Sequence, residues 1–169
     1  MGLPSKESRS VCNGLHIKIT DDLGKGVFAS NRIYSGDPIM IFGGEQVSSA
    51  DIVDFTHYLQ IGPDLYLGPS GDYDDYVNHN CDPNCAVYFE NDQVVLKAIK
   101  DICPEEQLSL DYGTIQFNEP TVILCQCGSE NCRKIIGNFY LMPEDLQNRY
   151  LDDKIVPLLT KYTKEDLKI

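Results

Sequence analysis

Three cysteines lie close together in the last third of the chain, at Cys125, Cys127 and Cys132. The residues between them include Gly, Ser and Asn, which form turns, so three thiolate sulfurs could converge on one tetrahedral zinc ion. Zinc usually takes a fourth ligand, and no Cys or His follows Cys132 in the sequence. The fourth ligand must therefore come from upstream, where Cys81 and Cys85 are the candidates.

Two other interpretations of these cysteines are weaker. They could be unmetallated thiols, although three cysteines are rarely placed in one loop without a ligand role. They could form a redox dithiol, but the usual Cys-x-x-Cys spacing is absent. Cys12 and Cys103 stand alone in the sequence, which is typical of ordinary buried thiols.

Four other short segments of the chain have distinctive sequences. The segment 78–85 reads Asn-His-Asn-Cys-Asp-Pro-Asn-Cys, and the segment 106–112 reads Glu-Gln-Leu-Ser-Leu-Asp-Tyr. The segment 24–29 reads Gly-Lys-Gly-Val-Phe-Ala, and Phe-Gly-Gly-Glu occupies 42–45. Together with Cys-x-Cys-x4-Cys-Arg at 125–133, these segments resemble, in order, the motifs of SET-domain protein-lysine methyltransferases with a post-SET zinc motif.

The resemblance implies a fold and a cofactor. The expected fold is α+β and mostly β, with several small curved sheets, a pseudoknot and a C-terminal helical segment. The expected cofactor is S-adenosylmethionine, bound by Gly24, Lys25, Gly26, Asn78 and His79. The glycines would let the backbone approach the cofactor closely.

The resemblance also implies catalytic and metal-binding roles. Tyr112 would place its hydroxyl beside the transferred methyl group. The uncharged amine of the substrate lysine would attack this methyl group and displace it from the sulfonium of the cofactor. Tyr58, Leu110 and Tyr112 would line the substrate channel. Leu110 lies where the family carries Phe or Tyr, and leucine cannot hold a restricting water, so more than monomethylation is expected. The implied zinc ligands are Cys81, Cys125, Cys127 and Cys132, with Zn²⁺ tying the loop over the cofactor.

The sequence departs from the family pattern at Asp75. An acid stands there where the family usually has an Arg near the carboxylate end of the cofactor, which raises the question of what replaces that contact. Only 32 residues separate Glu45 from Asn78, so the insert that helps to choose substrates is short.

The elements that must position these residues are mostly short strands. Alternating or apolar runs predict strands at 15–19, 27–29, 39–42 and 108–112, two strands within 58–67, and a hairpin within 86–99. A short helix is predicted at 48–55, with Ser49 as its N-cap. From Pro143 onward the apolar spacing becomes helical, with a break or kink at Pro157. We therefore expect an N-terminal extension at 1–13, a SET domain at 14–113, a post-SET segment at 114–140 and a C-terminal helical extension at 141–169.

Composition narrows the partners. The net charge is −12, with 26 acidic against 14 basic residues, which disfavours direct binding to nucleic acid or anionic membranes and favours Lys/Arg-rich proteins. The alternative is that the acidic excess serves solubility alone. No apolar run suits a membrane span or a signal peptide. The expected location is therefore intracellular, in the cytoplasm or nucleus; a bacterial chain would meet eukaryotic histones only after secretion into a host.

These observations predict a methyltransferase that acts on a Lys/Arg-rich protein segment such as a histone tail. One alternative is a catalytically silent SET module that acts as a zinc-stabilised binding or scaffold protein. Another is a redox or structural protein with chance motif matches, which would leave the Asn78 and Tyr112 motifs unexplained. The C-terminal segment could pack on the core, cover the substrate groove or form a homodimer contact.

Overall fold

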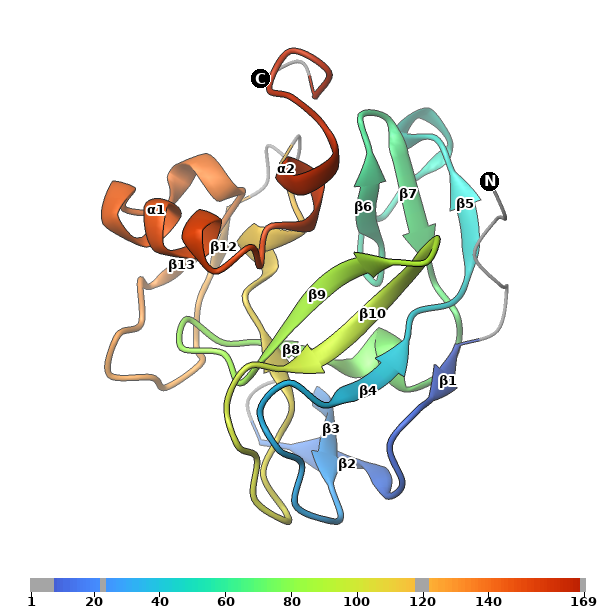
Figure 1. Ribbon diagram of the computed structural model, residues 1–169, viewed down its shortest axis with the longest axis vertical. Coiled ribbons are helices and arrows are strands. Elements are labelled where there is room, and N and C mark those ends of the chain that lie inside the picture. The colour runs from blue at the N-terminus through green and yellow to red at the C-terminus, as the bar shows by residue number, and fades with distance from the viewer. Residues whose placement is uncertain (1–7, 22–23, 118–121, 168–169) are drawn as a thin grey trace.

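The computed structural model describes residues 8–21, 24–117 and 122–167. Short strands in several small sheets make up most of the regular structure, and the helices are few and gathered toward the C-terminal end (Figure 1). The predicted α+β, mostly β, class is confirmed. No helix in the described part of the chain has the length and apolar character that crossing a bilayer would require.

The largest sheet has four antiparallel strands in the order β1-β4-β10-β9. These are β1 (Arg9–Ser10), β4 (Pro38–Ile41), β9 (Cys85–Glu90) and β10 (Gln93–Ala98). β9 and β10 form the predicted hairpin, in which Asn91 and Asp92 both have positive φ. That combination is the type I′ turn, whose twist matches the twist of the flanking strands.

Two further antiparallel units are formed by other strands. One is the hairpin of β2 (Leu15–Thr20) and β3 (Gly24–Ala29). The other is a three-stranded sheet in the order β5-β7-β6, made of β5 (Glu45–Val47), β7 (Leu65–Gly68) and β6 (Leu59–Gly62). Buried residues of β2, β3, β4, β6, β7, β9 and β10, among them Val27, Met40 and Leu67, share the main hydrophobic core.

A short parallel pair joins two segments that are far apart in sequence. β8 (Asn78–His79) pairs with β11 (Ser109–Leu110), with Asn78 opposite Ser109 and His79 opposite Leu110. The strand predicted at 108–112 therefore ends at Leu110. The side chain of Asp111 accepts a hydrogen bond from the backbone N–H of Gly113 and caps a 3-10 turn at Tyr112–Thr114, which stops the strand.

The helix predicted at 48–55 is wrong. Only a 3-10 turn at Ser49–Asp51 forms, with Ser48 rather than Ser49 as its N-cap. The Ser48 hydroxyl also donates to the Asp64 carboxylate at 2.8 Å, and none of the turn's residues is buried. Local side-chain bonds and the lack of an apolar face therefore favour a loop over a helix.

The C-terminal part forms a second hydrophobic core. The hairpin of β12 (Ile123–Leu124) and β13 (Ile135–Ile136) leads to α1 (Glu144–Asp152) and α2 (Pro157–Lys161). The predicted break lies at Pro157, which starts α2. Tyr150 and Leu158 are buried in this core with Phe117 and Phe139, so the C-terminal segment packs on the rest of the chain.

Candidate active site

The parallel pair β8–β11 places the two main polar motifs next to each other. Tyr112 lies two residues after the end of β11. Its ring lies edge-on to the ring of His79, with centroids 5.4 Å apart. The Tyr112 hydroxyl donates to the backbone carbonyl of Val77 at 3.0 Å. Burial raises the pKa of Tyr112 to about 12, so its phenol stays neutral at physiological pH.

His79 is buried and held at both ring nitrogens. Its Nδ1 accepts from the backbone N–H of Tyr112 at 3.2 Å, and its Nε2 lies 3.3 Å from Sγ of Cys81. Burial lowers the pKa of His79 to about 4; the nearby Asp111 charge acts in the opposite direction, and the Arg133 charge offsets part of that effect. The neutral ring therefore carries its proton on Nε2, directed at the sulfur.

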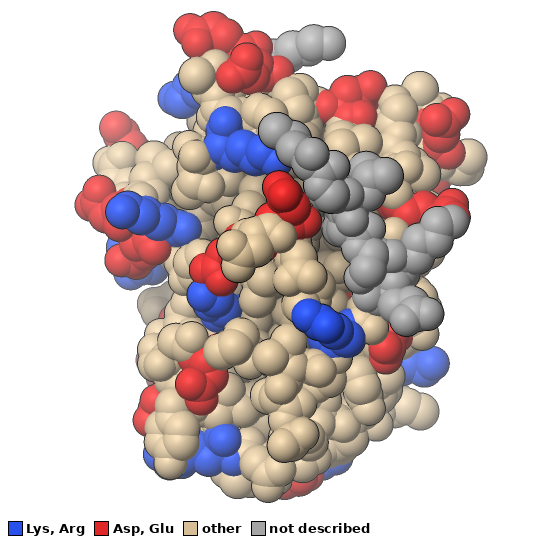
Figure 2. All heavy atoms as spheres, turned by 45° about the vertical axis from the view of Figure 1, so that its right-hand side comes forward, with Lys and Arg blue, Asp and Glu red and all other residues tan. Residues whose placement is uncertain are grey.

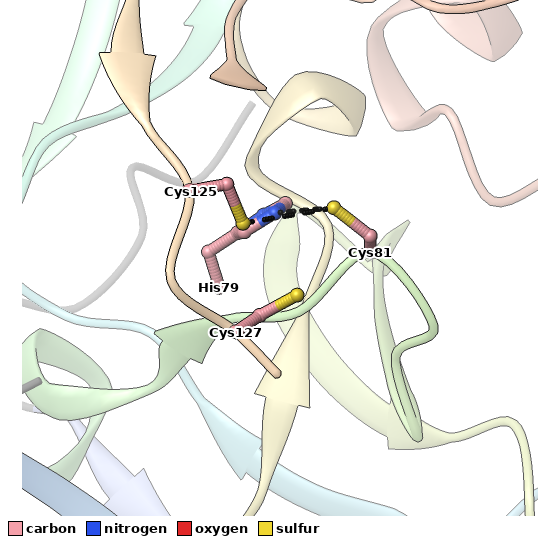
Figure 3. Close-up of side chains that lie close together, drawn as sticks. All are labelled: His79, Cys81, Cys125 and Cys127. Carbon is pink, nitrogen blue, oxygen red and sulfur yellow. Dashed lines mark hydrogen bonds between the residues drawn. The ribbon is translucent and has the colours of Figure 1, made fainter. Parts of the chain in front are cut away.

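The sulfur atoms of the two cysteine motifs converge beside His79. The ligand-type atoms of His79, Cys81, Cys125 and Cys127 all lie within 4.8 Å of one another. Figure 3 shows these four side chains gathered around one point. Sγ of Cys81 and Sγ of Cys125 are 3.7 Å apart. Zinc–sulfur bonds of about 2.3 Å in a tetrahedron put two sulfurs about 3.8 Å apart, so this separation fits a shared zinc ion.

Cys132 lies at the edge of this cluster. Its Sγ is not among the four ligand-type atoms that lie within 4.8 Å of one another, but it approaches the carbonyl of Cys125 at 3.9 Å. His79 is a poor substitute as a ligand, because the Nε2 that faces the cluster carries the ring proton. Burial raises the pKa of the Cys81 and Cys125 thiols, so a bound metal would have to displace their protons.

Cys85, the other upstream candidate, is not part of the cluster. Its thiol is buried and donates to the Asn84 side chain at 3.3 Å, and burial strongly raises its pKa. Asn84 in turn donates to Glu106 and to the carbonyl of Gln107, which fastens one polar motif to the other. Cys103 is exposed, contrary to the prediction of a buried thiol, while Cys12 is half-buried.

A cavity of about 720 Å³ opens beside Tyr112. Its walls include Tyr58, Leu110 and Tyr112 of the predicted substrate channel, together with Lys25 and Asn78 of the predicted cofactor site. The sequence therefore predicted residues that the fold brings to one cavity. Gly24 and His79 are not among its lining residues. Gly26 lies beside it, since a Cβ there would approach Nδ2 of Asn78 to 3.1 Å.

Asp75 lies on the wall of this cavity, and backbone amides hold its carboxylate in place. Its carboxylate accepts from the backbone N–H groups of Ser70 at 3.0 Å and Gly71 at 2.7 Å. On the same wall, Nζ of Lys25 lies 4.8 Å from the centre of the Tyr76 ring. A cation is thus available in the cavity although the sequence carries an acid at position 75.

The hydrogen-bond partners of Asp111 could not be predicted from the sequence. The Asp111 side chain is fully buried and accepts two hydrogen bonds from the guanidinium of Arg133, at 2.7 and 2.8 Å, and a third from the Tyr150 hydroxyl at 3.2 Å. Arg133 was visible only as the last residue of the cysteine motif. Nothing in the local sequence marked Tyr150, which comes from α1.

Comparison with known proteins agrees with this arrangement. A profile of the SET domain matches residues 24–113. The chain is 27% identical over 158 residues to a protein of Caenorhabditis briggsae named "Probable histone-lysine N-methyltransferase set-23", a match that covers 78% of this chain and 66% of the relative.

Solved structures also match. Two crystal structures of KRYPTONITE superpose on 73% of this chain and 29% of theirs: one with mCHG DNA and SAH, at 26% identity and a TM-score of 0.63, and one with mCHH DNA, an H3(1-15) peptide and SAH, at 25% and 0.60. The chain thus spans about two thirds of the length of the nematode relative and less than a third of KRYPTONITE. The motifs, the cavity and the domain match together show that this chain belongs to the SET-domain family.

Proposed function

We propose that this protein is an S-adenosylmethionine-dependent protein-lysine N-methyltransferase that acts on a Lys/Arg-rich segment such as a histone tail. The observation that carries the proposal is that one cavity is lined both by Tyr58, Leu110 and Tyr112 and by Lys25 and Asn78. The name of the nematode relative and the H3 peptide in the KRYPTONITE crystal support a histone substrate. Such a substrate would place the protein in the nucleus.

The residues on the cavity wall suit the proposed cofactor. When bound, S-adenosylmethionine supplies an electrophilic methyl group on a sulfonium centre. The Asn78 side chain donates to the carbonyl of Lys25 at 2.9 Å, which holds the segment 24–26 against β8. The ammonium of Lys25 can bind the cofactor's carboxylate, a task that Asp75 cannot perform.

Tyr112 acts by alignment in this proposal. A free lysine amine has a pKa of about 10.4 and must lose its proton before it attacks. Tyr112 cannot be the base, because its pKa of about 12 keeps it protonated. The proton therefore leaves to solvent, and the apolar channel favours the neutral amine. The hydrogen bond from the Tyr112 hydroxyl to the Val77 carbonyl fixes the position of this hydroxyl. In the proposed reaction the fixed hydroxyl would border the methyl group and the lysine nitrogen.

Zinc has a structural role in this proposal. We assign Cys81, Cys125, Cys127 and Cys132 as its ligands, with His79 hydrogen-bonded to the Cys81 sulfur and outside the metal's ligand set. The ion would join Cys81, which follows β8, to the segment 125–132 and close that side of the cavity. Zinc-loaded protein should therefore resist proteolysis in this segment better than chelated protein.

The product is proposed to carry more than one methyl group. Leu110 is buried on the channel wall and has no group that can hydrogen-bond a water. The channel therefore keeps room for a methylated amine to rotate and react again.

Methyl transfer to an array of peptides and proteins tests the proposal, with wild type and Tyr112→Phe measured side by side. We expect transfer to lysines in basic segments by the wild type and a large loss in the variant. Equal activity in the two would refute the role of Tyr112. Absence of any heat on titration with the cofactor would instead support the silent binding module.

A further inference from the structure

Asp111, the residue before Tyr112, is a buried charge that accepts hydrogen bonds from Arg133, from the Tyr150 hydroxyl and from the backbone N–H of Gly113. Its side chain has no solvent exposure, and the Arg133 side chain that pairs with it is 12% exposed. Among the described residues, its ion-pair contacts are with Arg133 and with Nδ1 of His79 at 3.6 Å. Because that Nδ1 accepts from Tyr112 and so lacks a proton, Arg133 supplies the positive charge.

Arg133 belongs to the segment that carries the cysteines, not to the strand that carries Tyr112. Its backbone N–H lies 3.4 Å from Sγ of Cys81, while its guanidinium makes two parallel bonds to Asp111. This paired geometry is stronger and more directional than a single ionic contact. The segment is thus held to the site by an ion pair as well as by its sulfur atoms.

A displaced segment would leave Asp111 charged and buried without a counter-ion, which is a costly state. Tyr150 of α1 donates to the same carboxylate, but a neutral hydroxyl cannot replace the charge. Asp111 also caps the turn that starts at Tyr112. Any movement of Asp111 therefore moves the backbone of Tyr112.

We infer that Arg133 is a positioning residue, which locks the segment 122–136 onto Asp111 and thereby fixes the backbone of Tyr112. The Arg133–Asp111 clamp makes closure of this segment and the placement of Tyr112 one coupled event. The consequence for methyl transfer rests on the proposed function, whereas the clamp itself does not.

Hydrogen exchange of the zinc-loaded full chain tests the clamp without any methyl transfer. Arg133→Met should raise exchange in the segment 122–136 and at the Tyr112 amide by about a hundredfold, because it strands the Asp111 charge. Exchange in β9 and β10 should stay unchanged. The double variant Asp111→Asn/Arg133→Met removes both charges and should restore most of the protection.

Arg32→Met is the matched control, because Arg32 makes an exposed ion pair with Asp101 at 3.6 Å. It should exchange as the wild type does. Wild-type protection of 122–136 in Arg133→Met, or no rescue in the double variant, would overturn the clamp.

Kinetics test the positioning role. In Arg133→Met, kcat should fall by on the order of a hundredfold because Tyr112 is misplaced, with a smaller change in KM, and the double variant should regain activity. Faster exchange with an unchanged kcat would make Arg133 merely structural and overturn positioning. If the wild type transfers no methyl group, the proposed function fails, and exchange at the Tyr112 amide alone decides the inference.

Discussion

At the scale of the residue, burial sets the chemistry of Tyr112. The phenol has lost most of its contact with water, and its hydroxyl has one fixed acceptor in the Val77 carbonyl. Both effects favour the neutral form. In the proposed reaction this side chain would therefore orient the reacting atoms over the whole physiological pH range, and it would not take up the lysine proton.

The raised pKa of Tyr112 makes stability depend on alkaline pH. The pKa is about 10 in the unfolded chain and about 12 in the folded protein, so the contribution is complete below pH 10 and is lost as pH rises through 12. Between pH 8 and pH 11 the wild type should lose about 1 kcal/mol more unfolding free energy than Tyr112→Phe. Urea unfolding at both pH values measures this difference, and an equal loss in the two proteins would contradict it.

Leu110 should control the number of methyl groups added. Leu110→Tyr introduces a hydroxyl that can hold a water in the channel, which reduces the room for a methylated amine. We expect mass spectra of the product to move from di- and trimethyl-lysine toward monomethyl-lysine. Leu110→Met, similar in volume and also apolar, is the control. Monomethyl product alone from the wild type with excess cofactor would refute the proposed role.

At the scale of the element, close backbone contacts hold the sheets around the cavity. β5 pairs with β7 so that Glu45 lies opposite Gly68. Gly44 has φ +113, and a Cβ there would lie 2.6 Å from the Gly68 Cα. Gly43 and Gly68 line the cavity, so this crossing of two glycine-containing segments shapes its wall.

Gly44→Ala should therefore cost more stability than an ordinary glycine substitution. The new Cβ meets the Gly68 backbone, which cannot move aside as a flexible side chain can, so we expect a loss of about 3 kcal/mol from strain and overpacking. Gly36→Ala is the control, because Gly36 also has positive φ, +94, but its Cβ would meet nothing within 4 Å. Thermal unfolding of both variants decides, and equal losses would mean that the crossing has no added steric cost.

At the scale of the whole molecule, the two features that bear on the site are the distribution of charge and the second hydrophobic core. The net charge is −12, and Figure 2 shows acidic side chains in several separate groups over one face, with basic side chains among them. On that face the acidic groups are therefore spread out and do not form one patch. The C-terminal helices pack into their own core and reach the site through Tyr150.

Salt should weaken substrate binding without changing the chemical step. Raising the salt concentration from about 50 to 300 mM shortens the screening length, so KM for a Lys/Arg-rich peptide should rise severalfold while kcat stays constant. A peptide with the same target lysine and neutral flanking residues is the control, and its KM should change little. A parallel rise for both peptides would argue against electrostatic attraction of the substrate.

The sequence by itself determined the mostly β class, the motif residues and the chemistry they suit, because alternating apolar residues and fixed motif spacings are local properties. It could not show that Ser48 and Ser49 bond to Asp64 in place of forming a helix, or that Asp75 is bound by two backbone amides. Only the tertiary structure placed Arg133 and Tyr150 on Asp111 and removed Cys85 from the cysteine cluster. The Arg133–Asp111, Tyr150–Asp111 and Cys81–Cys125 contacts join residues 22, 39 and 44 positions apart, and such pairings depend on how the sheets and the C-terminal helices pack.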